Sequence, residues 1–258
     1  MPSSPQPTNQ PEPVSHNQPE PIPDRTSPPS TDQHIKPARK PLLRLEARDL
    51  STLGVQSFLS LVNAAAVLED AVHHTLDLLY TAHTPIPPTR SITLVLRSMD
   101  GVAYTTGSDL DNDHKEIHLS TDYVAAIPSA HRANEIRGVL VHEMVHCWQW
   151  NAGGTAPGGL IEGIADWVRL KAGYAPGHWK RVWKDCKWDD GYEKTGYFLD
   201  FLESEVGEGT VRKINGSLQE GRYHEERFWK DCCGHSVGKL WEKYGECMKK
   251  ESKLADEA

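Results

Sequence analysis

The sequence predicts an α+β fold in which a small β-sheet is followed by a buried helix and a mainly helical C-terminal part. Three observations support this fold class. Segments with β-branched residues or two-residue alternation occur before residue 121, and such segments are typical of strands. Apolar residues surround most of a helix over residues 136–149, which indicates little solvent contact. From residue 192 the pattern is mainly helical.

The N-terminal segment, residues 1–41, is predicted to be a disordered tail. Residues 1–40 contain 11 of the 18 prolines and no aromatic residue, and such a composition cannot bury enough apolar surface to offset its ordering entropy. The segment lacks the apolar core and cleavage site of a secretory signal, which favours a cytoplasmic protein and leaves unconventional secretion as the alternative. We expect one domain over residues 42–250 and a charged tail over 251–258.

The elements of this domain follow in chain order, separated by Gly, Pro and polar residues. A single long helix over residues 55–81 carries an apolar stripe that would pack on the sheet. Its His73–His74 pair is interpreted as a solvated or satisfied pair, not as metal ligands. The expected strands cover residues 43–48, 92–96, 102–106 and 116–120, with a polar loop over 107–114, and the expected C-terminal helices cover 192–206, 209–219 and 237–250.

The buried helix carries the pattern His-Glu-x-x-His, which starts at His142. Residues four apart lie on one face of a helix, so His142 and His146 can offer two imidazoles to one zinc ion. Glu143 flanks that ion, where a general base for a metal-activated water should stand. On the same stripe, Gly138 leaves room and Gln149 adds a polar group. The alternative interpretation is a pair of satisfied core histidines on an amphipathic helix.

A catalytic zinc site has three protein ligands and an open position, so a third ligand is needed. A third histidine six residues after His146 is excluded, because position 152 is Ala. Glu162 is the remaining candidate, since it begins a helix after the Gly- and Pro-rich turn at residues 153–159. Asp166 lies one turn further on the same helix face, where it can accept a hydrogen bond from the second ring nitrogen of a ligand histidine.

The order of these motifs resembles that of known zinc peptidases. Glu-x-x-x-Asp after His-Glu-x-x-His resembles the gluzincins, the thermolysin-like peptidases, which implies that Glu162 is the third zinc ligand and that Asp166 orients His142. The longer pattern resembles the basic secretory protein peptidases of plants, fungi and bacteria over about residues 42–247. This pattern comprises HEMVHCWQ, a Gly-rich turn, GLIEGIADWVRLKAGY, Gly191–Tyr192, TGYFLDFLE and GKLWEKYG.

The resemblance implies a zincin-like metallopeptidase fold with a mixed sheet, and hydrolysis of peptide bonds by a metal-activated water with Glu143 as general base. In such peptidases the strand before the zinc helix borders the cleft and pairs with extended substrate backbone. Ile117, His118 and Leu119 are the candidates for that substrate-binding edge. The alternative for His118 is an ordinary strand histidine.

Zinc peptidases often add one Tyr or His donor for the developing oxyanion. Four residues of the C-terminal part are candidates for this role, namely Tyr192, Tyr197, His224 and His235. Tyr192 is favoured, because the family pattern has Gly-Tyr at that place. The alternative is a buried tyrosine whose hydroxyl is satisfied within the fold.

The net charge of −8 limits the classes of partner. An acidic surface argues against nucleic acid or an anionic membrane as the main partner, and we expect a monomer that acts on a peptide or protein substrate. No segment approaches the ~18 consecutive apolar residues of a membrane span. Two alternative functions remain: a non-catalytic zinc module that binds peptides or cell-wall components, and a metal hydrolase with a non-peptide substrate.

The five cysteines are an odd number, which together with the missing signal sequence indicates free thiols in a reducing compartment. Cys147 follows a ligand histidine, but its side chain points away from the ligand face. A disulfide between Cys186 and either Cys232 or Cys233 remains the alternative for an exported protein.

Overall fold

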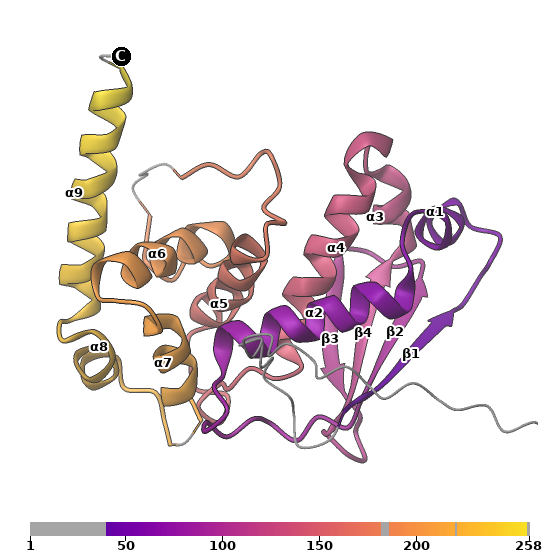
Figure 1. Cartoon of the computed structure of the whole chain (residues 1–258), viewed down its shortest axis with the longest axis horizontal. Helices are drawn as coiled ribbons and strands as arrows, with labels where there is room; N and C mark the ends of the chain where they lie inside the picture. Colours follow the sequence, from indigo (N-terminus) through magenta and orange to yellow (C-terminus); the bar gives the residue numbers. More distant parts are fainter. Residues whose placement is uncertain (1–39, 182–185, 220, 257–258) are drawn as a thin grey trace, which may run out of the picture. The chain divides into compact units, whose positions relative to one another are not determined.

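The computed structural model describes residues 40–181, 186–219 and 221–256 (Figure 1). The predicted disordered tail lies almost entirely outside these residues. The described part of the chain is a mixed α+β structure. Its elements are β1 Leu42–Ala47, α1 Leu53–Leu61, α2 Ala64–Leu79, β2 Ser91–Arg97, β3 Ala103–Gly107, β4 His114–Ser120, α3 Thr121–Ala126, α4 Ser129–His146, α5 Gly158–Lys171, α6 Tyr192–Glu205, α7 Thr210–Ser217, α8 Glu225–Cys233 and α9 Val237–Asp256.

The β-sheet has four strands in the spatial order β1-β2-β4-β3. β1, β2 and β4 run parallel, whereas β3 pairs antiparallel with β4. β2 is buried along nearly its whole length, as expected for an apolar strand with a neighbour on each side. The predicted small mixed sheet is therefore confirmed, and its two edges are β1 and β3.

Two helices cover one face of this sheet. α2 packs against β1 and α4, and α4 packs against β3 and β4 (Figure 1). The predicted single helix over residues 55–81 is wrong, because α1 and α2 meet at a bend of 73°. Asn63 lies between them, and its side chain accepts a hydrogen bond from the backbone N–H of Ala66 at 3.1 Å. This N-cap begins a second helix where the apolar pattern alone suggests continuation.

Among the described residues, no single helix is long and apolar enough to cross a membrane. Only α1 and α2 together reach that length and apolarity, and they form a bent pair.

α5 packs against both α4 and α6. It begins at Gly158, one turn before Glu162, which the sequence predicts as its start. Two glycines of α5 allow the close approach of the following segment: a Cβ atom at Gly163 would clash with Thr195, and one at Gly159 would clash with the carbonyl of Asp189.

The C-terminal part consists of α6 to α9. Trp229 of α8 is fully buried in the core of this part. α8 is absent from the helices predicted from the sequence. α9 continues through residues 251–256, so most of the predicted charged tail is helical. Cys232 and Cys233 are both thiols, and neither forms the alternative disulfide with Cys186.

Candidate metal centre

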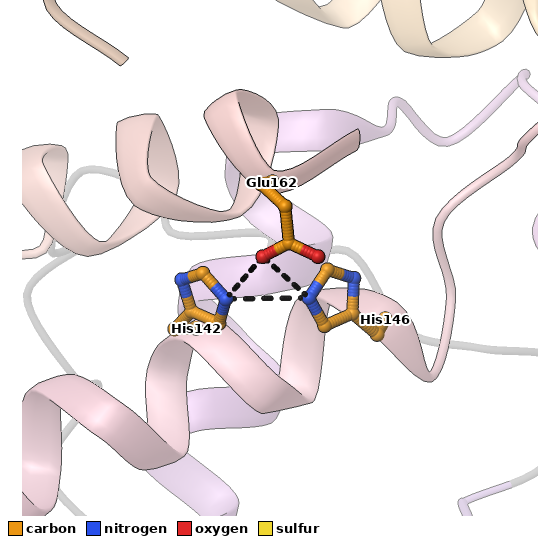
Figure 2. Close-up of side chains that lie close together, drawn as sticks. All are labelled: His142, His146 and Glu162. Carbon is orange, nitrogen blue, oxygen red and sulfur yellow. Dashed lines mark hydrogen bonds and ion pairs between the residues drawn. The ribbon is translucent and has the colours of Figure 1, made fainter. Parts of the chain in front are cut away.

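His142 and His146 lie one helical turn apart on α4 and face α5, from which Glu162 projects toward them (Figure 2). Their Nε2 atoms and a carboxylate oxygen of Glu162 all lie within 4.8 Å of one another. Nε2 of His142 is 3.3 Å from Nε2 of His146. Oε2 of Glu162 is 3.1 Å from the first of these nitrogens and 3.7 Å from the second. Across the described ranges, no other group of three His, Cys, Asp or Glu side chains could hold a metal ion.

Hydrogen bonds on the far side of each imidazole fix its orientation. Nδ1 of His142 lies 2.6 Å from Oδ1 of Asp166, which is 3% exposed. Nδ1 of His146 lies 3.0 Å from Oε1 of Gln149, whose amide nitrogen donates to the carbonyl of Ile161 at 2.8 Å. Because both acceptors face Nδ1, the proton of each neutral ring belongs on Nδ1. Both Nε2 lone pairs then point toward Glu162.

This arrangement favours a bound cation. While both rings are neutral, two lone pairs and one carboxylate oxygen converge, and none of these three atoms can donate a hydrogen bond to another. Burial opposes a charge on His142, but hydrogen bonds to Asp166 and then to Glu162 outweigh burial and raise the pKa of His142 to about 9. Burial alone would raise the pKa of Glu162, yet hydrogen bonds to both histidines lower it well below its usual value. A proton or a metal ion supplies the positive charge that the site lacks.

Glu143 lies beside these residues and is 6% exposed. The hydroxyl of Thr105, on β3, lies 2.7 Å from Oε2 of Glu143 and 2.9 Å from its carbonyl oxygen. Glu143 lines the same cavity as His142, His146 and Glu162. The cavity measures about 800 Å³, and residues 102–105 form part of its wall.

Tyr192 also lines this cavity. Its ring stacks on the ring of His142, and the two ring centroids are 6.2 Å apart. Its backbone has a positive φ of 49°, and the preceding Gly191 has a φ of 85°. A Cβ atom at Gly191 would lie 3.4 Å from the Cα of Gly159, so the chain enters α6 very close to the start of α5. The carboxylate of Glu162 raises the pKa of Tyr192.

Of the four candidate oxyanion donors, Tyr192 alone lies among the described residues that line this cavity. His224 and His235 line two other surface pockets. Tyr197 lies on α6 beside Trp179. The geometry therefore retains one candidate for the donor role.

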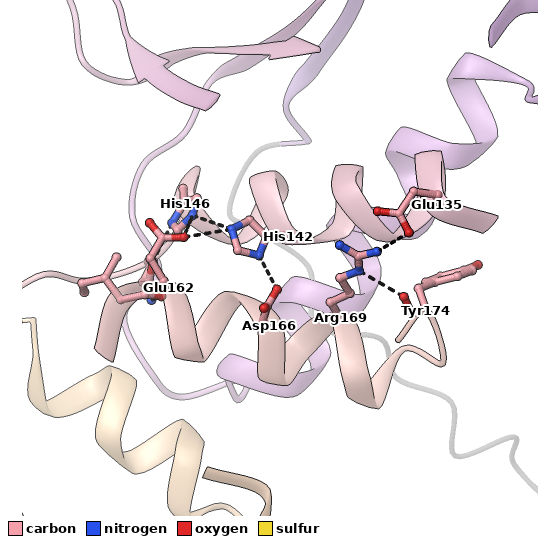
Figure 3. Close-up of polar contacts among 9 residues, drawn as sticks. Glu135, His142, His146, Glu162, Asp166, Arg169 and Tyr174 are labelled. Atoms are coloured by element: carbon pink, nitrogen blue, oxygen red, sulfur yellow. Dashed lines mark hydrogen bonds and ion pairs between the residues drawn. The ribbon is translucent and has the colours of Figure 1, made fainter. Parts of the chain in front are cut away.

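A second polar cluster connects α4 to α5 further along the same two helices (Figure 3). Arg169 is 7% exposed, and it donates to Glu135 at 2.8 Å and to the carbonyl of Tyr174 at 3.0 Å. The hydroxyl of Tyr123 donates to the other oxygen of Glu135 at 2.9 Å. A Cβ atom at Gly138 would lie 2.6 Å from Nε of Arg169. This cluster fixes how α4 and α5 pack, one to two turns from the ligands.

The predicted substrate-binding edge at Ile117, His118 and Leu119 is wrong. These residues belong to β4, which pairs with β2 on one side and with β3 on the other. Ile117 and Leu119 are fully buried in the core, and His118 stacks on Tyr104. The edge strand that borders the cavity is β3. After β2 the chain forms β3 at the edge of the sheet and then returns as β4, which pairs with β2 on one side and with β3 on the other.

The site residues predicted from the sequence do not include Thr105, Glu135 or Arg169. No local pattern predicts that Thr105 meets Glu143, because the two residues are 38 positions apart on different elements. The pair of Glu135 and Arg169 has a weak local signal: each lies on the face of its helix that also carries a predicted site residue.

Comparison with known proteins identifies the family of the chain. Residues 40–244 match a sequence model of the BSP family, which is described as "Peptidase of plants and bacteria". No curated protein and no solved structure matches the chain. Since the family match extends over most of the sequence and includes both α4 and α5, the chain belongs to the basic secretory protein family, a peptidase family of plants and bacteria.

Proposed function

We propose that this protein is a zinc-dependent peptidase with a zincin-like fold, in which His142, His146 and Glu162 hold the metal. The observation that carries this proposal is the convergence of two Nε2 atoms and one carboxylate oxygen at separations of 3.1, 3.3 and 3.7 Å. Tetrahedral zinc with bonds of about 2.0–2.1 Å separates its ligand atoms by about 3.3 Å. Two nitrogen ligands and one carboxylate are also a usual donor set for catalytic zinc.

Zinc bound at this site would polarise the scissile carbonyl and lower the pKa of a nearby water to about 7. Glu143 takes a proton from the attacking water and passes it to the leaving amine. Asp166 and Gln149 keep the protons of His142 and His146 on Nδ1, which leaves each Nε2 free for the metal.

A peptide substrate is supported by the position of β3. This strand pairs only with β4 in the described sheet, so its other edge is open, and Val102 to Thr105 line the cavity beside Glu143. An open strand edge can bind an extended peptide through backbone hydrogen bonds. Tyr192 borders the same cavity and supplies the donor for the developing oxyanion.

The metal site is tested by mass spectrometry of untagged protein beside His146→Ala and Glu162→Ala. We expect about one zinc per wild-type chain, in keeping with a single three-ligand site, and a loss or sharp weakening of binding in both variants. A folded wild-type protein that takes up no zinc would refute the proposal.

The reaction is tested by digestion of a peptide library beside a panel of simple esters and amides. We expect the wild type to cleave peptides, and Glu143→Gln to retain zinc and lose turnover, because the amide cannot accept the proton. Cleavage of the esters or amides but not of the peptides would favour a metal hydrolase with a non-peptide substrate. Zinc binding without any hydrolysis would favour a non-catalytic module.

A further inference from the structure

Thr105 occupies the inner face of the edge strand β3. Exposure alternates along this strand, with Ala103, Thr105 and Gly107 partly buried and Tyr104 and Thr106 exposed. β3 contacts α4 through its partly buried face. The Thr105 side chain therefore reaches α4 at the turn that carries the proposed base.

The Thr105 hydroxyl has one hydrogen and two acceptors within reach, both on Glu143. The carboxylate oxygen is at 2.7 Å and the carbonyl oxygen is at 2.9 Å. The carbonyl of Glu143 is one of the last four carbonyls of α4. The last turn of the helix tightens, so the N–H of Cys147 donates to the carbonyl of Met144 instead of the carbonyl of Glu143. A hydrogen bond to an ionised acceptor is stronger than one to a neutral carbonyl, so the carboxylate is the preferred partner.

No other hydrogen-bond donor contacts the Glu143 carboxylate among the residues that the structure describes. A glutamate side chain has several rotamers, and a base must stand within hydrogen-bond reach of the proton that it removes. We propose that Thr105 is a positioning residue that holds the Glu143 carboxylate in its working orientation and couples it to the substrate-binding edge. This inference rests on the proposed peptidase function of the same site.

Three variants test it. Thr105→Val removes the hydroxyl and keeps the shape, Thr105→Ser keeps the hydroxyl, and Thr106→Val is the matched control on the exposed face of the same strand. With a peptide that the wild type cleaves, we expect kcat of Thr105→Val to fall about 10- to 100-fold, with KM and zinc content unchanged. Thr105→Ser should restore kcat to within about threefold of the wild type, because its hydroxyl can form the same hydrogen bond, and Thr106→Val should match the wild type.

A purely structural role for Thr105, as a cap for the carbonyl at the end of α4, gives a different result. It would lower the melting temperature of Thr105→Val without changing kcat of the folded protein. Wild-type kcat in Thr105→Val would therefore overturn the proposal. An equal loss of kcat in Thr105→Ser would also overturn it, because the hydroxyl would then be irrelevant.

Crystal structures of the metal-loaded wild type, Thr105→Val and Thr105→Ser provide a measure that does not depend on activity. We expect the Glu143 carboxylate to keep one orientation in the wild type and Thr105→Ser, and to adopt other rotamers in Thr105→Val. An unchanged carboxylate in Thr105→Val would overturn the proposal. If the wild type hydrolyses no substrate, the proposed function fails, and this comparison still decides whether Thr105 orients Glu143.

Discussion

Gln149 connects His146 to the backbone that immediately precedes Glu162. Its Oε1 atom lies 3.0 Å from Nδ1 of His146, and its amide nitrogen donates to the carbonyl of Ile161 at 2.8 Å. The second hydrogen bond fixes which end of the amide faces the imidazole, so the oxygen is the acceptor. One side chain thereby orients a proposed metal ligand on α4 and ties it to the turn of α5 that supplies another.

Gln149→Ala should weaken zinc binding about 10- to 100-fold, the usual effect of removing a side chain that orients a histidine ligand. The variant lets the His146 ring rotate and lets its proton move to Nε2. Competition with a chromophoric zinc chelator measures the affinity directly. Gln56→Ala on α1 is the control and should bind zinc as the wild type does. Equal zinc affinities for the wild type, Gln149→Ala and Gln56→Ala would show that His146 needs no support from Gln149.

Gly138→Ala should destabilise the protein, although Ala is the better helix former by about 0.5–1 kcal/mol. Its Cβ atom would lie 2.6 Å from Nε and 2.8 Å from Nη2 of Arg169. Arg169 cannot easily move, because it is buried and paired with Glu135 and the carbonyl of Tyr174. We expect a loss of about 1–3 kcal/mol in the free energy of unfolding, typical of overpacking, measured by urea denaturation.

Gly238→Ala is the matched control for this overpacking. Gly238 also lies in a helix, α9, and nothing lies within 4 Å of a Cβ atom placed there. Its free energy of unfolding should stay the same or rise slightly, because only helix propensity changes. A Gly138→Ala protein as stable as the control would mean that Arg169 can shift without cost.

Tyr192→Phe should lower kcat about 10²- to 10³-fold, the usual effect of losing one oxyanion donor, and leave zinc content unchanged. The ring that stacks on His142 remains, so the change isolates the hydroxyl. Tyr197→Phe on the same helix is the control, because Tyr197 is absent from the described cavity wall. A Tyr192→Phe enzyme with wild-type kcat would remove Tyr192 from the catalytic residues.

The residues that converge at the centre were predictable because their spacing reflects helix periodicity. His142 and His146 share one face of α4 through a local four-residue repeat, and Glu162 and Asp166 do the same on α5. The connection over residues 147–157 then brings the two faces together. Such a signal is contained in about twenty-five consecutive positions of the sequence.

The edge of the sheet and the support of Glu143 were not predictable in this way, because they depend on strand order. β3 precedes β4 in the chain but lies outside it in the sheet. No local pattern distinguishes the observed order β2-β4-β3 from the order β2-β3-β4. The break between α1 and α2 had a local signal in Asn63, a good N-cap residue. The apolar stripe of the predicted long helix masked that signal.

Removal of the metal should lower the thermal stability of the wild type. A ligand that binds only the folded state adds about 2.7 kcal/mol when its free concentration is 100 times its Kd, and for a domain of this size each kcal/mol corresponds to about 2–4 °C in Tm. We therefore expect a strong chelator to lower Tm by roughly 5–10 °C relative to protein with saturating zinc. The measurement is differential scanning calorimetry with and without the chelator.

Two variants determine where the stabilising ion binds. Glu143→Gln leaves the three converging side chains intact and should keep the full difference in Tm between the zinc-loaded and chelated forms. His146→Ala removes one of the three donor atoms and should abolish most of that difference. If His146→Ala keeps the full difference, zinc stabilises the protein from another place, and the pair of histidines on α4 is a structural feature of the core.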